Sequence, residues 1–214
     1  MRRALMLLPV LGCQLEEPGG SGIAIGNPPG TAEARISLAE ADGVSFTSLA
    51  LPIVGLYLET CDPVEGRVVD LPRTVLGVRN APIEVSAGTY CGLGLVPETD
   101  ADTVLEGTAD GGTFTFTEPL GRIELFGEVE LRDGDAIVLE LARPDWIEPA
   151  AFGLAAGEHV DIGGERCVAD PLCARMRASL MDQAGLYTDD DADGEVDTPE
   201  RDRGESATGD ARRD

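Results

Sequence analysis

The sequence predicts a mainly β protein, an antiparallel β-sandwich of about eight strands that is followed by a C-terminal helix and an acidic loop. Three observations predict this fold class. Apolar and polar residues alternate with a period of two through the middle of the chain. The alternating runs are short and are separated by Gly, Pro, Asp and Asn. Asp133-Gly134 lies between two such runs and predicts a β-hairpin.

We assign the predicted strands to one β domain, residues 31–143. In the first run, Ala32, Ala34, Ile36 and Leu38 alternate with polar residues, as in a half-buried strand. Further candidate strands lie at about residues 44–49, 53–60, 66–71, 82–86, 90–96, 112–117, 121–131 and 136–142, and the last two are expected to form the hairpin. Short strands at this spacing are typical of sandwiches and barrels.

Residues 85–90, VSAGTY, resemble a strand-turn-strand element of transthyretin-like β-sandwich modules in bacterial surface proteins. The resemblance favours a sandwich over a barrel and implies no catalytic residues. Gly88 is expected at the turn, because glycine tolerates a positive φ angle. We expect Tyr90 to have a structural role.

Residues 144–187 are expected to form short helices and a loop. Trp146 is the only tryptophan in a chain with five Phe and three Tyr, so we expect it to cap the sandwich core. Asp170 and Pro171 have the residue types of an N-cap and a first helical position. The apolar residues that then recur at helical spacing are Leu172, Met176, Leu180, Ala184 and Tyr187.

The beginning of the chain indicates export and lipid attachment. Residues 1–12 combine a basic start with a short apolar run, as in a secretory signal peptide. Residues 10–13, VLGC, resemble the lipobox of bacterial lipoproteins. The resemblance implies cleavage before Cys13, acylation of that cysteine and a stable membrane anchor. Residues 13–30 are rich in Gly and Pro and are expected to form a flexible tether.

The lipoprotein resemblance also suggests a location. In double-membraned bacteria the residue after the acylated cysteine influences sorting, and Gln14 in place of aspartate implies the outer membrane. The alternative is an ordinary signal peptide that is followed by an incidental cysteine.

Four of the five cysteines remain once Cys13 is assigned to lipid. An oxidising compartment favours two disulfides, and four cysteines allow three pairings. We favour Cys61 with Cys91, which lie in the strand-rich region, and Cys167 with Cys173, which close a short loop before the predicted helix. Metal binding by the thiolates is disfavoured in that compartment.

Residues 189–200, DDDADGEVDTPE, resemble the calcium loop of EF-hand proteins. The ligands that the resemblance implies are the side chains of Asp189, Asp191 and Asp193, the carbonyl of Glu195, Asp197 through water, and a bidentate Glu200. Gly194 permits the turn in the middle of the loop. Residues 201–214 contain no large apolar residue, so we assign 188–214 to an EF-hand-like loop and a disordered acidic tail.

The chain is strongly acidic, with 16 Lys and Arg against 40 Asp and Glu and a formal charge of −24. Such a surface repels nucleic acid, and we expect no nucleic-acid partner. There is no lysine, so a catalytic lysine is excluded. His159 is the only histidine and is expected at the surface, and no serine lies in a nucleophile elbow.

These observations together predict a lipid-anchored, calcium-binding protein of the bacterial cell envelope. We expect a monomer that acts as a binding or structural module and is not an enzyme. One alternative is a calcium-dependent envelope hydrolase that uses two carboxylates about 5 to 10 Å apart beside an aromatic platform. Another is a lipoprotein whose acidic tail is a solvated spacer without metal.

Overall fold

The computed structural model of the protein describes residues 30–61, 64–74, 82–164, 167, 169–203 and 207–209. The predicted signal peptide, the lipobox cysteine Cys13 and all but the last residue of the predicted tether lie outside the described residues. Among the described helices, none combines the length and the hydrophobicity that a membrane span requires.

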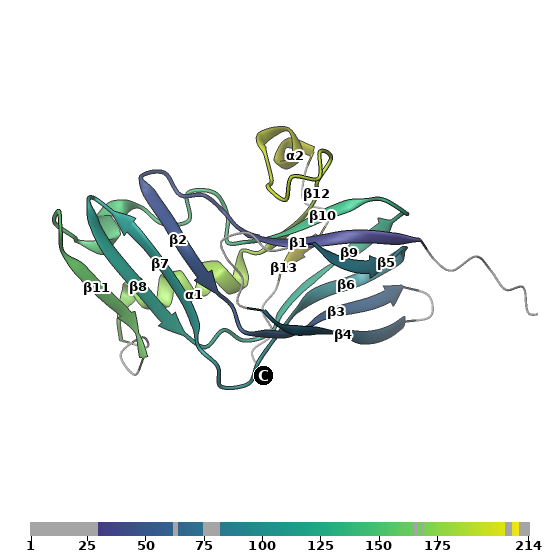
Figure 1. Ribbon diagram of the computed structural model, residues 1–214, viewed down its shortest axis with the longest axis horizontal. Coiled ribbons are helices and arrows are strands. Elements are labelled where there is room, and N and C mark those ends of the chain that lie inside the picture. The colour runs from purple at the N-terminus through teal and green to yellow at the C-terminus, as the bar shows by residue number, and fades with distance from the viewer. Residues whose placement is uncertain are drawn as a thin grey trace, which may run out of the picture.

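The described chain is mainly β-structure in two sheets (Figure 1), which confirms the predicted fold class with its C-terminal helix. The strands are β1 (Thr31–Leu38), β2 (Val44–Ala50), β3 (Ile53–Cys61), β4 (Val64–Thr74), β5 (Ile83–Ser86), β6 (Gly88–Pro97), β7 (Thr103–Ala109), β8 (Gly112–Glu118), β9 (Ile123–Leu131), β10 (Ala136–Leu141), β11 (His159–Gly163), β12 (Gly185–Thr188) and β13 (Ala207–Gly209). The helices are the 3-10 helix η1 (Pro149–Phe152), α1 (Pro171–Asp182) and α2 (Thr198–Arg203).

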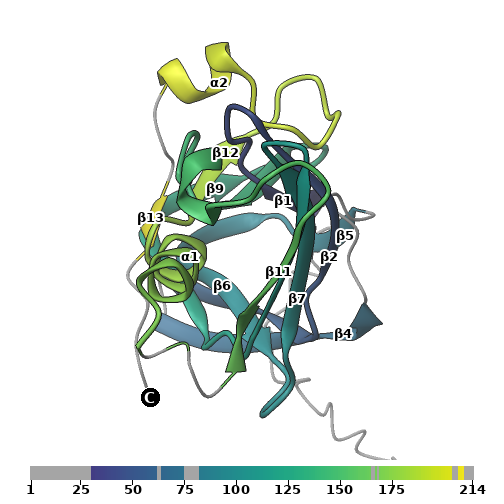
Figure 2. The same cartoon turned by 90° about the vertical axis from the view of Figure 1, so that its left-hand side faces the viewer.

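The two sheets differ in size. The larger sheet has the strand order β4-β3-β6-β9-β13-β12-β10-β1-β5, and the smaller sheet has the order β11-β8-β7-β2. The larger sheet curves, so that β1 lies opposite β4 and β6 in both views (Figures 1 and 2). One continuous buried cluster joins the parts of the molecule and contains Leu58 of β3, Phe116 of β8 and Leu180 of α1.

Buried and exposed side chains alternate along the strands, as the alternation of apolar and polar residues in the sequence predicts. Leu56 and Leu58 are almost fully buried, whereas Tyr57 between them is partly exposed. β10 is different, because all six of its residues are buried. Its inner face joins the main core, and Val138 on its other face packs in a separate cluster with Tyr187 and Val196.

The predicted hairpin at Asp133-Gly134 is wrong in its pairing. A turn is present there, but β13 and β12 lie between β9 and β10 in the sheet. The turn instead contacts β1, because the N–H of Thr31 donates to Asp133 Oδ1 at 2.9 Å and the N–H of Gly134 donates to the carbonyl of Thr31 at 2.9 Å. The residue types Asp-Gly therefore predicted the turn, but they did not predict that two other strands lie between the strands that flank it.

Four strands add to the predicted domain plan. β7 lies in the β domain at residues 103–109, where no candidate strand was expected, and the other three are short. β11 lies in the segment assigned to short helices and a loop, and so does β12. β13 lies in the predicted disordered tail. These strands have five, four and three residues, which is too short for a clear period of two, and the sheets recruit them through tertiary pairing. The predicted strand number of about eight is therefore too low.

Two further details correct the expected pattern. The pairs β1–β10 and β8–β11 are parallel, so the sheets are not purely antiparallel. The predicted helix reaches Tyr187, but α1 ends at Asp182 and Tyr187 lies opposite Val138 in the sheet. Gly185 is consistent with this early end, because glycine disfavours helix continuation. Asp170 is the N-cap as predicted, with Oδ1 accepting from the N–H of Leu172 at 2.9 Å.

Both favoured disulfides are present. Cys61–Cys91 joins the end of β3 to β6, and Cys167–Cys173 joins the segment before α1 to the first turn of that helix. The second bridge holds α1 against the core, because Cys167 and Cys173 are both buried in the main cluster.

Tyr90 and Trp146 have the structural roles that the sequence predicts. Tyr90 is 2% exposed, and its hydroxyl donates to the carbonyl of Ser86 at 2.7 Å across the junction of β5 and β6. Trp146 belongs to the main core, stacks on Phe46 with a centroid separation of 5.6 Å, and donates from Nε1 to the carbonyl of Ala39.

Candidate metal centre

The acidic loop, residues 189–200, connects two neighbouring strands of the larger sheet. It follows β12, leads into α2, and the chain then returns as β13, which pairs with β12 and β9. The last paired residues of β12 and β10 are Thr188 and Ile137. The loop starts directly after them, and the N–H of Asp189 donates to the carbonyl of Ala136 at 2.9 Å. Figure 1 shows the loop and α2 projecting from the sheet beside β12.

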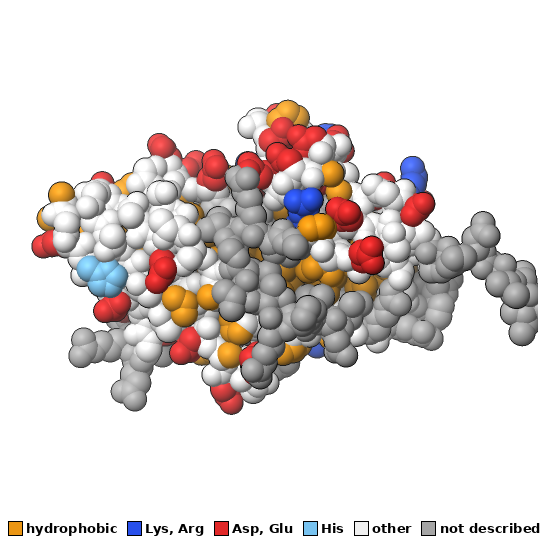
Figure 3. Space-filling view, viewed as in Figure 1, with side chains coloured by type: hydrophobic (Ala, Val, Ile, Leu, Met, Phe, Trp, Pro, Cys, Tyr) orange, Lys and Arg blue, Asp and Glu red, His pale blue; other side chains and the backbone are white. Residues whose placement is uncertain are grey.

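Three of the predicted ligands lie together in this loop. Carboxylate oxygens of Asp189, Asp191 and Asp193 lie within 4.8 Å of one another. Asp189 is 3% exposed and Glu200 is 6% exposed, whereas Asp191 and Asp193 face solvent. Acidic side chains gather around the projecting loop in Figure 3. The loop thus offers hard oxygen donors at a partly buried position, which is the ligand type that Ca²⁺ prefers.

Backbone hydrogen bonds wrap the loop around Asp189. Its Oδ2 accepts from the N–H of Gly194 at 2.9 Å, and its Oδ1 accepts from the N–H of Asp193 at 3.2 Å. Gly194 has a φ angle of +85°, and a Cβ there would lie 2.6 Å from Cδ of Arg35. The positive φ angle favours glycine at this turn, and the absence of a Cβ leaves room for the Arg35 side chain.

Glu200 closes the loop. Its Oε2 accepts from the N–H of Asp197 at 3.0 Å, while Asp197 Oδ1 accepts from the N–H of Glu200 at 3.2 Å. This reciprocal pair is the capping box of α2. Glu200 Oε1 also accepts from the N–H of Asp190 at 2.7 Å, so Glu200 links both ends of the loop. Each carboxylate oxygen has about two lone pairs, so acceptor capacity for a cation remains.

The loop is also anchored by an apolar side chain. Val196 is 5% exposed and packs with Val138 of β10 and Tyr187 of β12 on the outer face of the larger sheet. This contact explains why β10 is buried on both faces, and it fixes the orientation of the loop on the sheet.

Arginines supply further anchors that the sequence analysis missed. Arg201 of α2 forms an ion pair with Glu140 of β10, whose side chain is 3% exposed. Arg35 of β1 donates from Nη1 to the carbonyl of Asp193 at 3.3 Å. These partners are 61 and 158 residues apart in sequence, so no local pattern could reveal them. The Asp-x-x-Glu spacing of the capping box, in contrast, was a usable local signal.

The electrostatic environment of Asp189 favours a cation. Burial raises the pKa of the Asp189 carboxyl above its ordinary value, and the nearby charge of Glu200 acts in the same direction. The backbone N–H groups of Gly194 and Asp193 lower the pKa and offset this effect only in part. The fold therefore holds a carboxylate where its negative charge is unfavourable, and a bound cation would stabilise that charge.

The single histidine lies away from this loop, on β11. Thr113 Oγ1 lies 2.8 Å from Nδ1 of His159, and Asp161 Oδ1 lies 3.1 Å from Nε2. His159 is exposed, as predicted.

Comparison of the chain with known protein families, with curated proteins and with solved structures finds no match.

We expect Arg201→Ala to lower the free energy of unfolding by about 2 to 4 kcal/mol, because the variant removes the guanidinium group that pairs with the buried Glu140 carboxylate. Arg203→Ala is the matched control, since Arg203 pairs with Asp190 at an exposed position where such pairs contribute less than about 1 kcal/mol. Urea unfolding of both variants measures the difference. Equal losses in the two variants would contradict the anchoring role of Arg201.

Proposed function

We propose that this protein is a lipid-anchored, calcium-binding protein of the bacterial cell envelope that acts as a binding or structural module and is not an enzyme. The observation that carries the calcium proposal is the convergence of the Asp189, Asp191 and Asp193 carboxylates in a loop that Glu200 closes. The lipid anchor rests on the sequence at Cys13, outside the described residues.

The donor set fits Ca²⁺ in kind and number. Calcium takes six to eight oxygen ligands, and the EF-hand pattern supplies them from residues that the loop contains. The ligands would be the carboxylates of Asp189, Asp191 and Asp193, the carbonyl of Glu195, Asp197 through water, and both oxygens of Glu200. The raised pKa of Asp189 supports this assignment, because a divalent ion stabilises the charged carboxylate.

The position of the loop supports a structural role for the ion. The loop joins β12 to β13, and these strands lie between β10 and β9 near the middle of the larger sheet. Calcium bound by Asp189 and Glu200 would hold the two ends of the loop together. An ion at this position would therefore stabilise the pairing of the C-terminal strands as well as the loop itself.

Several side chains of the acidic loop are buried, which argues against the alternative that the acidic tail is a solvated spacer without metal. Asp189 is 3% exposed and Glu200 is 6% exposed, and Val196 packs on the sheet. These contacts favour a loop built into the fold over a solvated acidic spacer. Trp146 cannot serve as the aromatic platform of the hydrolase alternative, because it is buried in the core.

Calcium titration is the direct test of the loop. Calorimetry on the chain from Gln14 to Asp214 should show saturable binding with a dissociation constant of about 10⁻⁴ to 10⁻³ M. Glu200→Gln should abolish the binding, because it removes the charge of the bidentate ligand. Glu195→Gln is the matched control and should retain binding, since residue 195 is expected to coordinate through its carbonyl. Unchanged binding by Glu200→Gln would refute the site.

The affinity for calcium should fall with acidification. The pKa of Asp189 is raised in the folded, metal-free protein, so folding favours the protonated carboxyl. This group therefore makes the metal-free protein less stable as the pH rises through that pKa. Calcium binds the charged carboxylate of Asp189, so protons and Ca²⁺ compete for this group. We expect weaker binding at pH of about 5 than at pH of about 7, above the ordinary titration range of aspartate. Equal affinities in calorimetric titrations at the two pH values would contradict this competition.

The lipid anchor has its own test. The full chain expressed in a bacterial host with lipoprotein processing should enter the detergent phase on Triton X-114 partition, and Cys13→Ala should move it to the aqueous phase. The reason is that acylation of Cys13 supplies the membrane affinity. Cys91→Ala provides a control that loses a cysteine elsewhere, and its partition should follow the wild type. An unshifted Cys13→Ala variant would exclude the anchor.

A further inference from the structure

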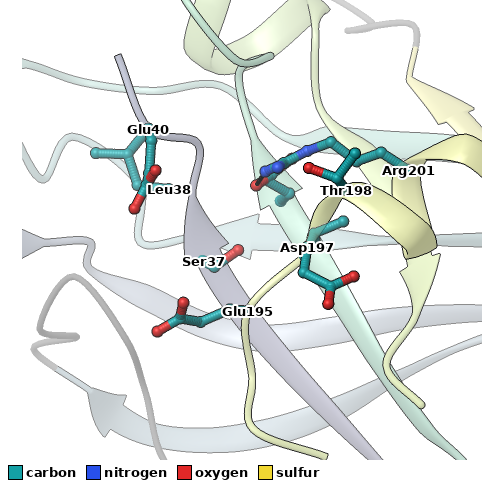
Figure 4. Close-up of a pocket in the computed structure, with 9 residues that line it drawn as sticks. Ser37, Leu38, Glu40, Glu195, Asp197, Thr198 and Arg201 are labelled. Atoms are coloured by element: carbon teal, nitrogen blue, oxygen red, sulfur yellow. Dashed lines mark hydrogen bonds and ion pairs between the residues drawn. The ribbon is translucent and has the colours of Figure 1, made fainter. Parts of the chain in front are cut away.

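The acidic loop also borders a pocket. This pocket of about 280 Å³ lies between the loop and the larger sheet (Figure 4). Ser37 and Leu38 of β1 and Glu140 of β10 line it from the sheet, and residues 195–198 line it from the loop. The volume is close to the lower end of the range for small-molecule sites. The carboxylates of Asp189, Asp191 and Asp193 do not line this pocket, whereas Glu195 and Asp197 border both the pocket and the proposed calcium site.

The pocket has a negative lining. The charged side chains among the described lining residues are Glu40, Glu140, Glu195, Asp197 and Arg201, so carboxylates outnumber guanidinium groups by four to one. Arg201, the one cation in the described part of the lining, forms an ion pair with Glu140. A pocket of this charge attracts cations and repels anions.

Ser37 provides an independent indication of a ligand. It is 6% exposed, and among the described residues its hydroxyl has no hydrogen-bond partner. Ser37 is the register partner of Glu140 in the parallel pair β1–β10. In Figure 4 its hydroxyl points to the side where Asp197, Thr198 and Arg201 lie. Leaving a buried hydroxyl without a partner is unfavourable, and a donor within the pocket would satisfy it.

We propose that this pocket binds a small molecule that carries an alkyl ammonium group. The ammonium N–H groups would donate to the Ser37 hydroxyl and to the carboxylates of the lining, while Leu38 and Val196 offer apolar surface to the alkyl part. The two proposals share Glu195 and Asp197, but the ammonium site uses Ser37 and Leu38, which belong to no calcium ligand set.

The experiment is a titration of the full chain in neutral detergent at low ionic strength with calcium removed. The probe is 1,5-diaminopentane, and 1,5-pentanediol is its uncharged counterpart. We expect saturable binding of the diamine and no binding of the diol. Ser37→Ala should weaken diamine binding about tenfold, because a hydrogen bond to a charged group is lost. Glu195→Gln should weaken it roughly threefold through the lost charge.

Asp191→Asn is the matched control for Glu195→Gln. It removes the same charge from the same loop at a residue that does not line the pocket, so diamine binding should stay close to that of the wild type. An equal loss in Asp191→Asn and Glu195→Gln would show diffuse surface attraction and overturn the proposal. Absence of saturable diamine binding by the wild type would overturn it as well. Calcium titration separates the two sites, because Ser37→Ala lies outside the proposed calcium ligands and should keep calcium binding, whereas Asp191→Asn should weaken it.

Discussion

The burial of two loop carboxylates against the larger sheet shapes the whole C-terminal region. Asp189 and Glu200 sit at the two ends of the acidic loop, and each is almost completely buried. Buried carboxylates require hydrogen bonds and compensating charge. The backbone N–H groups of Asp190, Gly194 and Asp197 provide the hydrogen bonds. A cation among the carboxylates is the most direct source of the charge, which is why the calcium proposal follows from the packing as well as from the sequence pattern.

The same loop is coupled to the sheet through charge and apolar contact. Arg201 follows Glu200 directly and pairs with Glu140, so the residue that closes the loop adjoins a residue fixed to β10. Val196 packs on the outer face of the same strand. Order in the loop and order in the sheet are therefore linked, and a ligand bound at the loop would affect both.

Sequence patterns predicted features that depend on local chemistry. The period of two placed most strands of the β domain, and Asp170-Pro171 marked the start of α1. The favoured pairing of Cys61 with Cys91 and of Cys167 with Cys173 is confirmed. Sequence patterns did not predict which strands pair with each other, because strand pairing joins residues that are far apart in the chain. The Asp133-Gly134 turn formed, yet β12 and β13 entered between its two strands.

The sequence by itself determined the β-rich class and the order of carboxylates in the loop, because these features depend on residue type and short spacing. It favoured the disulfide pairs among three possible pairings, and the structure decided them. Only the tertiary structure decided that the loop connects neighbouring strands, that Arg35 of β1 reaches the loop and that Arg201 of α2 pairs with Glu140 of β10. It also brought Ser37 beside Glu140 beneath the loop. The physical reason is that parallel pairing and buried ion pairs join residues far apart in the chain, and their energies depend on burial that no local pattern encodes.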